Sequence, residues 1–258
     1  MLFRGELCEF LSAYAAAILV AGSTTERCEK TVYRIAGVYG GDAEMTILPR
    51  TVTVTIRDRE NGEFCAISKP LKMVAVDFHR ISLLSQLSWD IRDERIPLVI
   101  ARKRFRDIVH KKRIGRFLSL LLISMANASW CRLFDGDYAG VVIVFIATVC
   151  GLLLRDNLTG RYRWDVRIAT LMAACCSSCL VSAAFLLHWT ATEDVALGTC
   201  VLYLVPGIMF INSVSDMVNG HLLYSFSRFI NACVLTACLG MGLSLGILLM
   251  NFELFSGL

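Results

Sequence analysis

A short polar pattern follows a proline–glycine pair near the end of an apolar stretch. Residues 204–220 have the sequence Leu-Val-Pro-Gly-Ile-Met-Phe-Ile-Asn-Ser-Val-Ser-Asp-Met-Val-Asn-Gly. Asn212, Asp216 and Asn219 recur at helical spacing, so one face of a helix carries all three. Lipid offers a carboxylate and two amides no hydrogen-bond partners. The pattern therefore indicates either a solute or ion pathway or a polar helix end that meets water, and both interpretations are open.

The proline–glycine pair predicts a break in the apolar helix. Pro206 lacks a backbone N–H and clashes with the carbonyl of Leu202, while Gly207 lets the backbone stay irregular. Carbonyls freed at such a break can ligate a cation or a substrate ammonium group, but a proline kink without a site is equally ordinary. Gly220 ends the pattern, and His221 beside it is either a proton acceptor or an interfacial histidine.

Two further places carry candidate residues. Asn127 is a strongly polar side chain deep in an earlier apolar stretch, where it lines a pathway or bonds a neighbouring helix. A predicted helix start near the N-terminus carries the charged or hydroxyl residues Thr25, Glu26, Arg27 and Glu29. Residues 1–115 contain no Gly-x-Ser-x-Gly, no glycine-rich phosphate loop and no His/Glu metal pair. We therefore predict no catalytic residue, no metal ligand and no cofactor.

The eleven cysteines have no framework spacing, which fits a reducing cytoplasm without disulfides. Cys175, Cys176 and Cys179 resemble a ligand cluster but lack a His or a second Cys pair at metal-site spacing. We interpret them as small residues that pack between helices.

Charge is distributed very unevenly along the 258 residues. Residues 1–116 hold 20 of the 26 Lys and Arg residues and 14 of the 22 Asp and Glu residues, and no lysine follows Lys112. The chain is 56% hydrophobic, with a mean hydropathy of +0.60. We predict an α+β cytoplasmic domain over residues 1–115, followed by an all-α polytopic membrane domain over residues 116–258.

The predicted cytoplasmic domain combines helices with a small sheet. Helices are expected at 5–21, 24–39, 81–91 and 97–112, and strands at 43–48, 51–57, 64–69 and, as a possible fourth, 74–77. The alternation of Thr51-Val-Thr-Val-Thr-Ile predicts a strand with one buried face, and Asn61-Gly62 predicts a hairpin turn. The apolar residues 10–22 are too short for a span and follow acidic residues, so we expect a domain helix that is not cleaved.

Five later stretches are apolar and long enough to cross a membrane. They are residues 117–134, 138–154, 168–189, 195–214 and 229–252. The arginine-rich loop at 155–167 and Arg228 mark the cytoplasmic side, whereas acidic turns at 135–137 and 193–194 mark the other side. The N-terminus is therefore expected in the cytoplasm and the C-terminus outside.

A basic cluster precedes the first predicted span. It consists of Arg102, Lys103, Arg104, Arg106, Lys111, Lys112, Arg113 and Arg116, against Asp107 alone. Such clusters usually fix topology, with binding of anionic lipid head groups as a secondary effect. We expect contact with membrane lipid and no nucleic-acid partner.

Two segments resemble the threonine/serine exporter family. Residues 21–36 are similar to its "G-a-x-T-x-R-v-E-x-x-i-x-r-i-a" opening, and residues 204–221 to its "l-v-P-G-x-x-l-i-n-x-i-x-D-l-l-x-G" segment. Asn127 to Gly136 also resembles the family's first-span region. The chain departs from the pattern at Cys28, where Val is usual, and at Asp135, where Gly is usual. Asn219 likewise stands where Ser is common.

The resemblance implies a cytoplasmic domain with five spans in the bacterial inner membrane. The chain ends at Leu258, after the fifth predicted span, so it resembles the split form in which a second small polytopic membrane subunit supplies the other half. Known activities in the family are export of threonine and serine and, in a split pair, of succinate. By position, Pro206, Gly207, Asn212, Asp216 and Gly220 match the membrane motif, and Thr25, Arg27 and Glu29 match the cytoplasmic one.

Three functions follow as hypotheses. The first is a subunit of a secondary exporter of small amino acids or dicarboxylates, with Asp216 handling the coupling ion and the Pro206-Gly207 break and Asn212 forming part of the substrate site. The second is a membrane-anchored, hydrolase-like cytoplasmic enzyme. The third is a non-transporting regulatory or assembly subunit. We favour the exporter subunit over an enzyme.

Overall fold

The computed structural model describes residues 2–58, 64–71, 76–111 and 115–256. It divides into two compact units. The first comprises Met1–Lys112 together with Ile208–Phe229, and the second comprises Arg113–Gly207 together with Ile230–Leu258. A segment of the predicted membrane domain thus packs with the N-terminal part of the chain.

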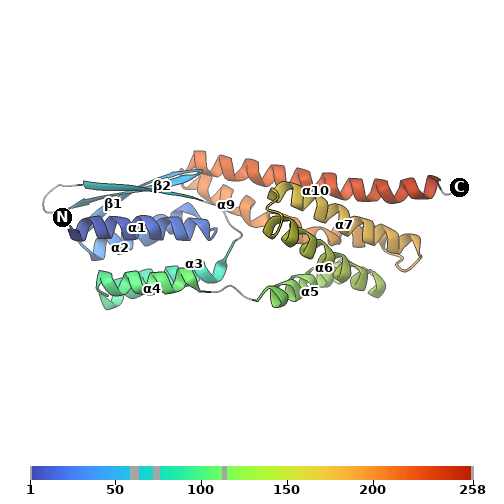
Figure 1. The fold of residues 1–258 in the computed structure, drawn as a ribbon, viewed down its shortest axis with the longest axis horizontal. Coiled ribbons are helices and arrows are strands. Elements are labelled where there is room, and N and C mark those ends of the chain that lie inside the picture. Colours follow the sequence, from blue (N-terminus) through green and yellow to red (C-terminus); the bar gives the residue numbers. More distant parts are fainter. Residues whose placement is uncertain (1, 59–63, 72–75, 112–114, 257–258) are drawn as a thin grey trace. The chain divides into compact units, whose positions relative to one another are not determined.

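The first unit places two helices between a sheet and a helix pair (Figure 1). Its elements are α1 (Leu2–Val20), α2 (Thr25–Val38), β1 (Gly41–Leu48), β2 (Thr51–Asp58), β3 (Phe64–Pro70), α3 (Phe78–Glu94) and α4 (Leu98–His110). The three strands are antiparallel in the order β1-β2-β3. Helix α1 contacts the sheet on one side and α3 and α4 on the other.

The central position of α1 explains its composition. Leu11, Tyr14 and Ile18 are fully buried, because both sides of the helix are covered. The Tyr14 hydroxyl donates to the backbone carbonyl of Leu84 at 2.7 Å, and burial raises the pKa of this phenol. Residues 10–20 therefore belong to a buried domain helix, as the apolar pattern indicated, and residues 21–22 form the turn after it.

The three strands lie where alternation predicted them, each within two residues. Val52, Val54 and Ile56 of β2 are buried, as expected for one face of a strand that packs on helices. The predicted Asn61-Gly62 turn, and all but the last two residues of the possible strand at 74–77, lie outside the described residues. The described part of the chain is mostly helical, with one small sheet.

The second unit is helical. It contains α5 (Arg116–Leu133), α6 (Tyr138–Gly160), α7 (Val166–Leu186), α8 (Glu193–Cys200) and the short 3₁₀ helix η1 (Leu202–Leu204). The long helix α10 (Leu222–Ser256) begins in the first unit and continues into the second, and α9 (Gly207–Val218) belongs to the first unit from Ile208 onward.

Three helices in the described part of the chain are long and apolar enough to cross a membrane: α6, α7 and α10. A fourth crossing results if α8 with η1 and the bent continuation α9 count as one broken span. Helix α5 forms where the first span was predicted but is not among them, and its Ser119, Ser124, Asn127 and Ser129 lower its apolar content. The five predicted spans are thus confirmed only in part.

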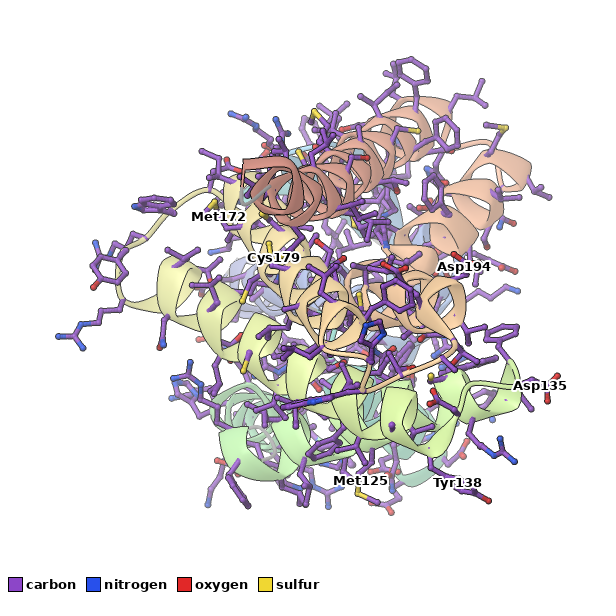
Figure 2. All side chains as sticks on the ribbon, turned by 90° about the vertical axis from the view of Figure 1, so that its right-hand side faces the viewer. Met125, Asp135, Tyr138, Met172, Cys179 and Asp194 are labelled. Atoms are coloured by element: carbon purple, nitrogen blue, oxygen red, sulfur yellow. The ribbon has the colours of Figure 1, made fainter. Side chains whose placement is uncertain are left out.

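Exposed apolar side chains surround this unit. Met125 and Tyr138 are 53% and 78% exposed and point outward from the helices that carry them (Figure 2). The interior of the unit instead contains small and hydroxylated residues, such as Ala173, Ala174 and Ser177. Small interior residues with large apolar exterior ones are typical of helices that pack within lipid.

Polar contacts join the helix ends of the second unit. At one end, Arg116 pairs with Asp156 at 3.1 Å, and the Arg167 guanidinium donates to Asn231 at 3.0 Å. At the α5–α6 turn, Asp137 accepts hydrogen bonds from the Thr190 and Thr192 hydroxyls, both at 2.7 Å. The start of α5 thus meets the end of α6, and the start of α6 meets the segment that follows α7. This pattern indicates that neighbouring helices are antiparallel.

Candidate functional site

Asp216 lies fully buried in the first unit, near the end of α9. Its Oδ1 accepts two hydrogen bonds from one residue, the backbone N–H and the hydroxyl of Thr25, at 2.8 and 2.9 Å. Its Oδ2 accepts from the Arg228 guanidinium at 2.8 Å. Both carboxylate oxygens are therefore occupied, and the two motif segments of the sequence meet at this single side chain.

The position of Thr25 adds an electrostatic contribution. Thr25 is the first residue of α2, and its N–H is one of the donors that a helix leaves unsatisfied at its N-terminus. Thr24 caps the helix, because its hydroxyl accepts from the Arg27 N–H. The Asp216 carboxylate thus faces the positive end of the α2 dipole, which stabilises its charge.

Arg228 is the second buried charge of the site. It lies in the second turn of α10, and its side chain is only 3% exposed. One of its nitrogens bonds Asp216, and the other donates to the Ser23 carbonyl at 3.2 Å and to the Tyr224 hydroxyl at 3.0 Å. Such a pair is stable in a protein interior when further hydrogen bonds complete both partners, as they do here.

Two further polar side chains, one in α9 and one directly after it, contact residues 22–26. The Asn212 amide donates to the Gly22 carbonyl at 2.9 Å, and the Asn219 amide lies 3.5 Å from the Glu26 carboxylate. Asn212, Asp216 and Asn219 therefore meet residues 22–26 in register, which accounts for their helical spacing. In this structure their partners are protein groups of the first unit.

Gly220 shapes the turn that brings Arg228 back to Asp216. Its φ of +85° is a left-handed conformation that favours glycine. Its N–H donates to Met217, and the His221 N–H donates to the Asp216 backbone carbonyl, which is the Schellman end of a helix. The turn also places the His221 ring 3.2 Å from the Glu29 carboxylate.

The predicted break lies at Val205-Pro206, between η1 and α9. The Leu202 carbonyl accepts from the Val205 N–H at 3.1 Å, so the tight turn satisfies the carbonyl that the proline frees. Gly207 is the first residue of α9, with open space where a Cβ would point. The fourth predicted span is therefore two helical segments rather than one.

Asn127 belongs to the second unit, whereas Asp216 and its partners belong to the first. Its amide donates to the Thr148 hydroxyl of α6 at 2.7 Å, and both side chains are buried. This contact bonds a neighbouring helix, which was one of the two interpretations of Asn127 from sequence. Among the described residues no group of three or more His, Cys, Asp or Glu side chains is arranged to hold a metal ion.

Arg228 is a member of the site that the sequence did not predict. Its place before the last predicted span indicated a loop charge, whereas α10 begins six residues earlier, at Leu222. The available signal was its separation of 12 residues from Asp216 across Gly220, a glycine typical of a helix end. Because Arg228 is paired and buried, its charge says less about membrane side than an exposed loop arginine does.

Comparison with known proteins gives a direct assignment. The family described as putative threonine/serine exporter matches residues 9–250 of the chain. The chain belongs to this family. The match includes both segments that meet at Asp216.

Two relatives place this exporter-family chain beside named transport proteins. A "Probable succinate transporter subunit YjjP" from Klebsiella aerogenes is 25% identical over 233 residues, 88% of each chain. A protein of the same description from Escherichia coli K12 is 31% identical over 150 residues, 56% of this chain and 57% of the relative. No solved structure matches. Family and relatives are transport proteins, which favours a membrane exporter component over an enzyme.

Proposed function

We propose that the chain is a subunit of a secondary exporter in the bacterial inner membrane, with threonine and serine or a dicarboxylate such as succinate as substrate. Membership of the exporter family supports export, and the printed description of the two relatives supports succinate as one candidate. Those relatives are described as subunits, which supports a second polytopic membrane protein as partner.

The proposed topology keeps five spans, with the N-terminal domain over residues 1–115 in the cytoplasm and the C-terminus outside. Arg116, Asp156 and Arg167 belong to one end of the second unit, and Asp137 with Thr190 and Thr192 to contacts at the α5–α6 turn. These contacts support alternating crossings by α5, α6 and α7. Membrane lipid then covers the exposed apolar side chains of this unit.

The observation that carries the mechanism is the buried pair of Asp216 and Arg228. Both oxygens of this carboxylate are already occupied, one by Thr25 and the other by the Arg228 guanidinium. A proton or metal cation can therefore occupy Asp216 only when Arg228 leaves it. We propose that this exchange couples the ion to export, and that it loosens the contact of α9 with Thr25.

The neighbouring residues have roles that follow from this exchange. Asn212 and Asn219 hold α9 against the loop that begins at Gly22, and Gly220 keeps Arg228 in reach of Asp216. The Pro206-Gly207 break is the proposed pivot, because α9 can move there without bending a continuous helix. Thr25, Glu26, Arg27 and Glu29 belong to the helix start against which α9 closes.

Reconstitution of both subunits in substrate-loaded proteoliposomes tests the proposal. The pair is expected to release labelled threonine, serine or succinate, and the partner alone is expected to release none. Efflux by the partner alone would make this chain a regulatory or assembly subunit. Turnover of a substrate by purified residues 1–114 without any membrane would instead support an anchored enzyme.

The exchange at Asp216 needs a variant test in the same vesicles. Asp216→Asn preserves size but removes the charge that holds Arg228, so efflux should fall well below that of the wild type while staying above that of empty vesicles. Asp156→Asn is the matched control, because that carboxylate is exposed and pairs only at the surface. Wild-type efflux in Asp216→Asn would remove this carboxylate from the mechanism.

A further inference from the structure

A second polar group lies inside the second unit, where α5, α6, α7 and η1 meet. We name it the hydroxyl cluster; it consists of Ser124, Asn127, Thr148, Ser177 and Tyr203. The Ser177 hydroxyl donates to the Ala147 carbonyl at 3.1 Å and lies 3.0 Å from the Tyr203 hydroxyl. The next residue of α6, Thr148, accepts a hydrogen bond from the Asn127 amide at 2.7 Å.

Ser124 is the member without a partner. It is fully buried, and its hydroxyl oxygen has no hydrogen bond among the residues that the structure describes. The tight turn at Asp135-Gly136-Asp137 makes α5 and α6 antiparallel neighbours, so Ser124 lies about one turn from Asn127 toward the level of Gly151. A buried hydroxyl without a partner costs free energy unless something else bonds it.

Gly151 lets two hydroxyls of the cluster pack directly against the α6 backbone. A Cβ at this position would overlap both the Tyr203 hydroxyl and the Ser177 hydroxyl. Polar side chains therefore converge on the part of α6 that has no side chain of its own. The members lie in the middle turns of α5, α6 and α7, and Tyr203 lies three residues before the Pro206 break. Broken helices at mid-depth are where transporters commonly bind solutes.

The cluster is neutral. The buried charged side chains among the described residues are Asp216 and Arg228, and both belong to the first unit. A carboxylate of a solute would find no opposite charge from these residues, and burying it unpaired is costly. Hydroxyl and amide groups can instead exchange hydrogen bonds with a hydroxyl of the solute.

We propose that the hydroxyl cluster is a solute-binding site that recognises the uncharged hydroxyl of a small solute, with Tyr203 and Ser124 as its contact groups. The inference rests on the proposed export function and adds to it where the solute binds and which of its groups is recognised. Asn127, Thr148 and Ser177 hold the contact groups in place.

Matched pairs of solutes test this recognition in vesicles that hold both subunits. L-Threonine and L-valine differ by a hydroxyl in place of a methyl group, and malate and succinate differ by one hydroxyl. The wild type should favour the hydroxylated member of a transported pair. Tyr203→Phe removes one partner of that hydroxyl, so the preference should fall about five- to tenfold, the size of one neutral hydrogen bond.

Control variants separate binding from packing. Thr159→Val removes a hydroxyl that bonds only carbonyls of its own helix near the end of α6, so the preference should not change. Gly151→Ala would displace the Tyr203 and Ser177 hydroxyls from the α6 backbone and should lower efflux of every solute at least tenfold. Gly160→Ala, with nothing near its Cβ position, should leave efflux intact.

The outcomes distinguish the two proposals. Wild-type preference in Tyr203→Phe together with full efflux in Gly151→Ala would overturn the hydroxyl cluster as the binding site, and export by the chain would stand. Absence of efflux from wild-type vesicles with both subunits would overturn the proposed function and this inference with it. If Gly151→Ala does not fold, the solute preference of Tyr203→Phe alone decides whether the hydroxyl cluster is the binding site.

Discussion

At the scale of single residues, the chemistry of the first unit depends on one carboxylate and its partners. Asp216 joins the start of α2 to the start of α10 through Thr25 and Arg228. Removing either charge leaves the other buried without a partner, which is far more costly than losing a surface ion pair.

Asp216→Ala should therefore destabilise the protein by about 3–5 kcal/mol, because Arg228 is left uncompensated. The double variant Asp216→Leu/Arg228→Met removes both charges and should lose clearly less. Thermal unfolding in detergent gives both values. If the double variant is the less stable of the two, the cost does not come from an unpaired buried charge.

Asp137 provides a prediction about pH. Hydrogen bonds from Thr190 and Thr192 lower the pKa of this carboxyl below its ordinary value. A lowered pKa in the folded state means that the stabilisation is present above the unfolded pKa of about 4 and is lost as pH falls through the folded one.

Asp137→Asn keeps one oxygen that can accept from Thr190 and Thr192, replaces the oxygen that accepts from the Ala191 N–H with an amide donor, and does not titrate. It should be less stable than the wild type at pH 7, and the difference in melting temperature should shrink as pH falls toward 3. A difference in melting temperature that stays constant from pH 7 to pH 3 would mean that ionisation of Asp137 does not stabilise the folded protein.

Residue types and spacing indicated much of the Asp216 site. The spacing of Asn212, Asp216 and Asn219 identified one polar face correctly, and the first turn of α2 was correctly placed. The sequence could not show that these two segments contact each other, because 191 positions separate Thr25 from Asp216. Arg228 was hidden for a related reason, since pairing depends on the turn at Gly220.

At the scale of elements, the contact between α7 and α10 depends on glycines. A Cβ at Gly242 would overlap the Leu171 carbonyl, and one at Gly246 would overlap Ser178. The Cys179 thiol also lies 3.6 Å from the Gly246 carbonyl. These small residues therefore bring α10 close to α7 within this chain.

Gly242→Ala should separate these helices and lower the melting temperature in detergent by several degrees. Gly240→Ala is the matched control on the same helix, because nothing lies within 4 Å of its Cβ position. It should leave the melting temperature unchanged or raise it slightly, since alanine favours helix over glycine. Equal effects of the two substitutions would contradict close packing at Gly242.

The elements themselves followed well from periodicity. Strand β2 alternates cleanly, and the helices predicted at 5–21, 24–39, 81–91 and 97–112 form as α1 to α4. The predicted helix boundaries were wrong where apolar residues continue across the start of a helix or across a break in it. The last helix begins at Leu222 rather than Phe229, and the fourth apolar stretch contains a break, because Pro206 cannot continue the hydrogen-bonded ladder.

At the scale of the whole molecule, an N-terminus in the cytoplasm and a C-terminus outside require an odd number of membrane crossings. Alkaline phosphatase fused after residue 258 should be active in cells, because the C-terminus is expected outside, and a fluorescent protein at the same position should be dark. Fusions after residue 161, in the arginine-rich loop, should give the opposite result. An active phosphatase at residue 161 would contradict the proposed orientation.

The most direct test of the central claim is a double-mutant cycle on efflux, with Asp216→Asn and Arg228→Gln in vesicles that hold both subunits. If the pair acts as one coupling unit, each single variant should lose efflux, and the double variant should be no worse than the more damaged single. If the two losses multiply, the residues act independently, and the proposed exchange at Asp216 is wrong.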